Sequence, residues 1–92
     1  MSTAARARHA GSMVRYVLHH RHEPPECGVV FASFRGYESP LRHQPTLASC
    51  YSGGHAIWWT VDAASEEDAL ELLPSFVAER TTATRVREVR IP

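Results

Sequence analysis

Apolar and polar residues alternate near the start of the chain, in the segment MVRYVLHH. One parity carries Val14, Tyr16, Leu18 and His20. A period of two residues is typical of a strand that buries one of its faces. The pattern therefore predicts a first strand over residues 13–20, with these four side chains on the same face of a sheet.

The spacing then changes to a helical one. Cys27, Val30, Phe31 and Phe34 recur three and four positions apart and form one apolar stripe. Pro24 and Pro25 suit the first turn of a helix, and Gly36 is placed to end it. The sequence therefore predicts one helix between the prolines and the glycine. Residues 37–45 have the polar, proline-bounded composition of a loop.

The same two periodicities recur in the second half of the chain. Two strands are predicted over residues 46–52 and 55–63, with Gly53-Gly54 forming a tight turn between them. Ser65 and Asp68 have the spacing of a capping box that opens a second helix, and Pro74 should kink that helix. The last strand is predicted over residues 84–92.

The predicted order of elements is βαββαβ. This order is typical of an α+β, ferredoxin-like sandwich, in which two helices cover one face of a four-stranded antiparallel sheet. The other face stays open, and such a face is commonly covered by a second subunit, so we expect a homodimer. Residues 1–12 show no periodicity and are expected to be a disordered tail, which leaves one domain over 13–92.

Composition excludes several classes of function. The net charge is zero, which argues against nucleic acid or a charged membrane surface as the main partner. No apolar run approaches the ~20 residues of a membrane span, and we expect a cytoplasmic protein. All ten basic residues are arginine, so lysine-based Schiff-base chemistry, pyridoxal phosphate and a P-loop are excluded. Two cysteines are too few for a disulfide framework.

The segment GGHAIWWTVDAASEEDALELLPSFVAERTTATRVREVRIP resembles the hairpin, second helix and last strand of the dimeric α/β-barrel superfamily. Proteins of that superfamily include small isomerases and monooxygenases. The resemblance implies two subunits whose sheets close face to face into a barrel. It carries no catalytic signature, so it implies a fold and a homodimer rather than an activity.

The predicted topology places the end of the first strand, the start of the first helix and the Gly53-Gly54 turn at one end of the molecule. His20, His22 and His55 meet there and predict a transition-metal site, with Glu26 or Cys27 as a further ligand. Imidazole and thiolate groups suit zinc, nickel or copper. The spacing matches no standard zinc motif.

Two other interpretations of this end stay open. The histidines can be exposed residues at a strand end, and both Cys27 and Cys50 can be small core residues. Alternatively, Cys27 at the start of a helix can be a reactive thiol with His22 as its base.

A different function is predicted on the open face of the sheet. His19 and Arg15 are candidate catalytic residues there, and Tyr51, Trp58 and Ser49 are candidate ligand-binding residues. Such a site suits a cofactor-independent isomerase, cyclase or monooxygenase-like enzyme that acts on a small organic acid or aromatic compound. The same residues also suit a dimer interface, in a structural homodimer without small-molecule chemistry.

Overall fold

The computed structural model of the chain describes residues 13–92, so the predicted tail over 1–12 lies outside the described residues. Its centre is a four-stranded antiparallel sheet, which confirms the predicted α+β class. The strands are β1 (Val14–Arg21), β2 (Leu47–Ala48), β3 (Ala56–Ala63) and β4 (Thr81–Val86), in the spatial order β2-β3-β1-β4.

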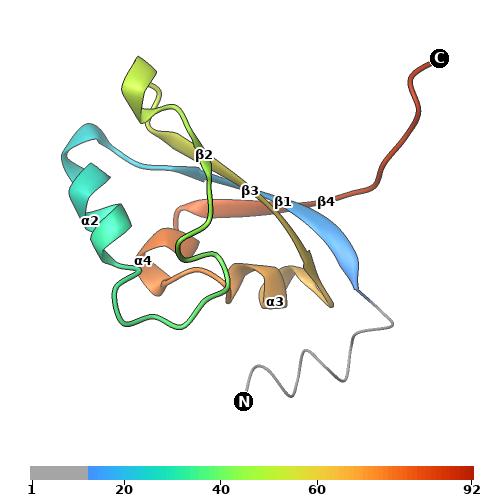
Figure 1. Cartoon of the computed structure of the whole chain (residues 1–92), viewed down its shortest axis with the longest axis horizontal. Coiled ribbons are helices and arrows are strands. Elements are labelled where there is room, and N and C mark those ends of the chain that lie inside the picture. The colour runs from blue at the N-terminus through green and yellow to red at the C-terminus, as the bar shows by residue number, and fades with distance from the viewer. Residues whose placement is uncertain (1–12) are drawn as a thin grey trace.

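Short helices lie on one side of this sheet (Figure 1). The 3-10 helix η2 (Pro24–Glu26) leads into α2 (Cys27–Ala32), and α3 (Glu66–Leu70) and α4 (Ser75–Ala78) follow β3. The prediction of one kinked second helix is wrong, because Pro74 ends the helical run and becomes the N-cap residue of α4. Proline has no N–H group to continue the hydrogen bonding of α3, and its ring clashes with the preceding turn.

The core lies between the sheet and these helices. The predicted alternation is confirmed, since Tyr16, Leu18 and His20 of β1 are buried on the face that the helices cover. Beside them on the neighbouring strand β3 lie Ile57, Trp59 and Val61, and the helical layer with its connecting turns adds Val30, Ala69, Leu72, Leu73 and Val77.

Two predicted strands have other bounds. β2 contains only two residues, because Ser49 leaves the extended conformation and the chain forms the 3-10 helix η3 (Cys50–Ser52). The last strand begins at Thr81, which pairs with His20, and ends at Val86. Residues 87–92, predicted as strand, have no regular secondary structure.

The sheet is open, with β2 and β4 at its two edges. It is not closed into a barrel, so the predicted barrel is not found in this chain, and the homodimer stays a prediction. Within residues 13–92, no helix has the length and apolar character that crossing a membrane requires.

Candidate metal centre

Four potential metal ligands gather at one end of the sheet. His22, Cys27, Cys50 and His55 each offer one ligand atom, and these atoms all lie within 4.8 Å of one another. We call this set the four-ligand cluster. Cys27 Sγ lies 3.2 Å from His22 Nε2 and 3.1 Å from His55 Nδ1, and Cys50 Sγ lies 3.6 Å from His22 Nε2.

These separations are close to those that a zinc ion imposes. With Zn–N of about 2.0–2.1 Å and Zn–S of about 2.3 Å, tetrahedral coordination separates a nitrogen from a sulfur by about 3.5 Å. The observed N···S distances of 3.1, 3.2 and 3.6 Å differ from that value by a few tenths of an ångström at most. These three N···S separations are therefore compatible with a shared zinc ion.

The β1–β3 pairing brings the two histidines together. The backbone N–H of His22 donates to the carbonyl oxygen of His55 at 3.1 Å, which extends the antiparallel ladder beyond its last strand residues. Cys27 returns to this point because the chain reverses through η2, where Glu23 and Glu26 form a capping box. The thiol thus lies beside both imidazole rings.

The turn between η3 and β3 places Cys50 and His55. Gly53 and His55 have positive φ values of 83° and 52°, respectively. The predicted turn needed positive φ at Gly53 and Gly54, so the second positive φ lies at His55 instead of Gly54. A Cβ atom at Gly54 would lie 2.8 Å from Ser49 Cβ, and the Ser49 hydroxyl accepts a hydrogen bond from Ala56 N at 3.0 Å. Left-handed backbone costs a residue such as His55 about 1–2 kcal/mol, and this tight turn holds it there.

His20 lies behind His22 and determines which nitrogen of His22 faces the cysteines. His20 Nδ1 lies 3.3 Å from the carbonyl oxygen of Val77 and 3.2 Å from Thr81 Oγ1, and His20 Nε2 lies 3.0 Å from His22 Nδ1. A carbonyl oxygen only accepts, so we assign the proton of His20 to Nδ1. His20 Nε2 then accepts from His22 Nδ1–H, and the lone pair of His22 lies on Nε2, facing Cys27. Metal-ligating histidines commonly have such a partner.

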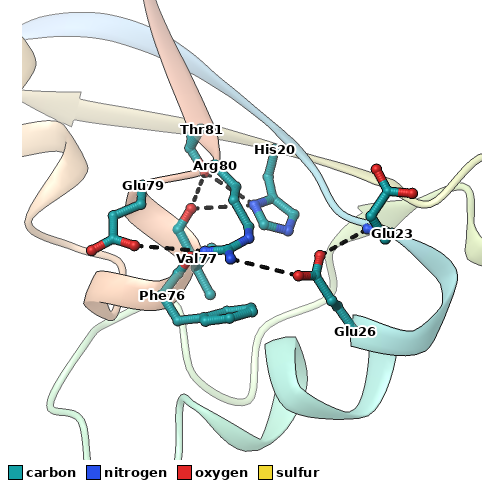
Figure 2. Close-up of polar contacts among 8 residues, drawn as sticks. All are labelled: His20, Glu23, Glu26, Phe76, Val77, Glu79, Arg80 and Thr81. Atoms are coloured by element: carbon teal, nitrogen blue, oxygen red, sulfur yellow. Dashed lines mark hydrogen bonds and ion pairs between the residues drawn. The ribbon is translucent and has the colours of Figure 1, made fainter.

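Glu26 is held away from the ligands by other contacts, which Figure 2 shows together with His20. Its Oε1 accepts from the backbone N–H of Glu23 at 2.9 Å, and its Oε2 lies 3.5 Å from Arg80 Nη2. The Arg80 guanidinium lies 3.7 Å above the ring centre of Phe76. Glu26 therefore connects the start of α2 to the segment between α4 and β4.

Burial changes the protonation of this region. Loss of solvent lowers the pKa of both His20 and His22 below 6.5, which favours the neutral imidazole that binds metals. Burial, followed by the neighbouring Cys50, raises the pKa of the Cys27 thiol. Without a metal, Cys27 is therefore a protonated thiol near neutral pH, and it donates to a histidine nitrogen.

Of the predicted metal ligands, the structure brings His22, His55 and Cys27 together. His20 is not part of the cluster but contacts His22 from behind, and Glu26 pairs with Arg80. Cys50 was not predicted as a ligand, and the structure adds it to the cluster. The spacing His22-x4-Cys27 is mirrored by Cys50-x4-His55, and this symmetry is a signal in the sequence that could have identified the fourth ligand.

The residues predicted on the open face are more scattered. His19 stacks on Trp58 with ring centroids 5.3 Å apart, and Arg15 Nε pairs with Asp62 at 3.3 Å. The predicted ligand-binding residues Tyr51 and Ser49 lie outside that face. Tyr51 is fully exposed on η3, and the Ser49 hydroxyl closes the turn.

Comparison of the chain with protein-family models, with curated proteins and with solved structures found no match. The likeness to the dimeric α/β-barrel superfamily therefore stays a resemblance.

Proposed function

We propose that this protein binds one zinc ion through His22, Cys27, Cys50 and His55, and that the ion has a structural role. The observation that carries the proposal is the convergence of four ligand atoms within 4.8 Å of one another, from four separate places in the fold. The orientation of His22 by His20 supports it, because the free lone pair of His22 faces the other ligands.

The number of ligands favours a structural ion over a catalytic one. Catalytic zinc sites usually have three protein ligands and keep one position for water or substrate, whereas structural sites have four. The ligands here come from the end of β1, the start of α2, η3 and the start of β3. One ion would therefore tie α2 and η3, which follows the two-residue strand β2, to the neighbouring ends of β1 and β3.

The donor set also favours zinc among the predicted metals. Two thiolates and two imidazoles suit zinc, which has no geometric preference of its own, and soft thiolates also accept copper(I). Nickel(II) prefers tetragonal surroundings. A reactive Cys27 is a weaker alternative, because the pKa of its thiol is raised, whereas an activated nucleophile needs a lowered pKa.

The direct test is the metal content of untagged protein by mass spectrometry. We expect about one zinc ion per chain for a single closed site of this kind. Cys50→Ser should lose it, and so should His55→Asn, because asparagine tolerates the left-handed backbone of this position. His19→Asn is the matched control, since it removes a histidine of the open face and should leave the zinc content unchanged.

Cobalt(II) substitution tests the ligand set itself. Two thiolates should give an intense sulfur-to-cobalt charge-transfer band, and Cys27→Ser should weaken that band. Metal-free protein that takes up neither zinc nor cobalt(II), or binding that survives both cysteine substitutions, would refute the proposal.

A further inference from the structure

A second concave site lies between α2, the loop over residues 37–46 and Trp59 of β3. Its volume is about 380 Å³, within the range of small-molecule sites, and the residues of the four-ligand cluster do not line it. Its lining is apolar at Phe31, Phe34, Leu41 and Trp59, with Arg35 and Arg42 beside them.

The aromatic residues provide a surface for a flat ring. Phe34 and Trp59 have ring centroids 6.2 Å apart, inclined by 48°, and Trp59 is almost fully buried. Phe31 differs from Trp59, because half of its surface is exposed to solvent although it lines the same apolar site. A bound aromatic ring would remove Phe31 from water and gain contact with the other two rings.

The loop that closes the site is anchored to the helical layer. The Ser39 hydroxyl donates to the carbonyl oxygen of Leu72 at 2.7 Å, and the Tyr37 hydroxyl donates to that of Glu71. His43, which also lines the site, has a φ of 65° in the left-handed region. Strained backbone of this kind persists where surrounding contacts hold it and is common at ligand sites.

The charges around the site have one sign. Arg35 and Arg42 line it and no carboxylate does. Within residues 13–92, the arginines that form ion pairs are Arg15 and Arg80, so the guanidinium groups of the site are not neutralised by the protein. Arg42 is also half-buried, which strengthens its interaction with an anion.

We propose that this site binds a small aromatic carboxylate. The ring lies against Phe31, Phe34 and Trp59, and the carboxylate accepts hydrogen bonds from Arg42 and Arg35, whose planar donor geometry matches a carboxylate. The apolar lining distinguishes this ligand from a simple inorganic anion, which would leave the aromatic surface in water. This inference does not depend on the zinc proposal.

Trp59 is the reporter in the test. The chain has two tryptophans, so Trp58→Phe on the open face leaves Trp59 as the sole source of tryptophan fluorescence. The full-length protein is titrated with phenylacetate, with its neutral analogue phenylacetamide and with acetate. Phenylacetate should change the fluorescence of Trp59 saturably, phenylacetamide should bind at least about tenfold more weakly, and acetate should have no effect.

Arg42→Gln should weaken phenylacetate binding by at least about tenfold. Arg90→Gln is the matched control, because it removes the same charge from the exposed C-terminal segment and should leave binding unchanged. The comparison of acid and amide on the parent protein needs no arginine variant, so it remains decisive if Arg42→Gln does not fold. Equal binding of acid and amide, equal effects of the two substitutions, or no saturable response to phenylacetate would each overturn the inference.

Discussion

Replacement of His20 by leucine tests how the core supports the four-ligand cluster. His20 is fully buried, its Nδ1 faces the Val77 carbonyl and the Thr81 hydroxyl, and its Nε2 faces His22 Nδ1. Leucine is of similar size and suits the apolar surroundings, so the substitution removes the hydrogen bonds with little change in packing. The substitution should therefore act through the lost hydrogen bonds and not through a change in packing.

The magnitude follows from which groups lose a partner. The Val77 carbonyl keeps the hydrogen bond from the Thr81 hydroxyl at 2.7 Å, so the buried N–H of His22 is the group left unsatisfied. Such a group costs about 1–3 kcal/mol, which should appear as a lower free energy of unfolding in zinc-free protein. Loss of the partner that orients a metal-bound histidine should also weaken zinc binding about 10- to 100-fold.

Urea unfolding in the presence of a chelator measures the first effect, and competition with a chromophoric zinc chelator measures the second. Thr81→Val is the control, because His20 keeps its bond to Val77 and zinc affinity should change little. If His20→Leu binds zinc as tightly as the parent protein, His20 does not orient His22, and the assigned positions of the protons are wrong.

The remaining predictions concern stability. Burial lowers the pKa of His20 and His22 below 6.5, so just below that pH the folded zinc-free protein binds fewer protons than the unfolded chain. The free energy of unfolding of the zinc-free protein should therefore fall as the pH falls below 6.5. Urea titrations at several pH values would show this decrease. Gly54→Ala should lower the free energy of unfolding by about 1–3 kcal/mol, because the new Cβ meets Ser49. Gly28→Ala, where open space surrounds the new Cβ, should instead stabilise α2 by about 0.5–1 kcal/mol. An unaltered melting temperature for Gly54→Ala would contradict the geometry of the turn. Leu18→Ala should cost about 2–5 kcal/mol and the exposed Leu47→Ala little, measured by thermal unfolding.

The strands of the core were predictable because burial imposes a period of two on the sequence. The faces of β1 and β3 follow from that alternation, and Leu18 and Ile57 are fully buried as their parity requires. The short elements were less predictable. β2 is too short to impose a period, and Pro74 separates two short helices whose joint apolar stripe resembles one long helix.

The candidate metal site was predicted in part. Parity placed His20 and His22 on the same face, but it cannot show which of them reaches the ligands and which lies behind. That distinction depends on the Val77 carbonyl, which is 57 residues away from His20 in sequence. Cys50 was assigned to a strand, and only the change to a 3-10 helix turns its sulfur toward His22.

The sequence by itself determined the order of the elements, the buried face of the main strands and the end of the molecule where histidine and cysteine gather. These features depend on local periodicity and on short-range turn preferences. The tertiary structure alone decided which four side chains converge at that end, which histidine lies behind them and which side chains line the pocket beside Trp59. These features depend on contacts between residues far apart in the chain, such as the hydrogen bond from His22 to His55 and the contact of Phe34 with Trp59.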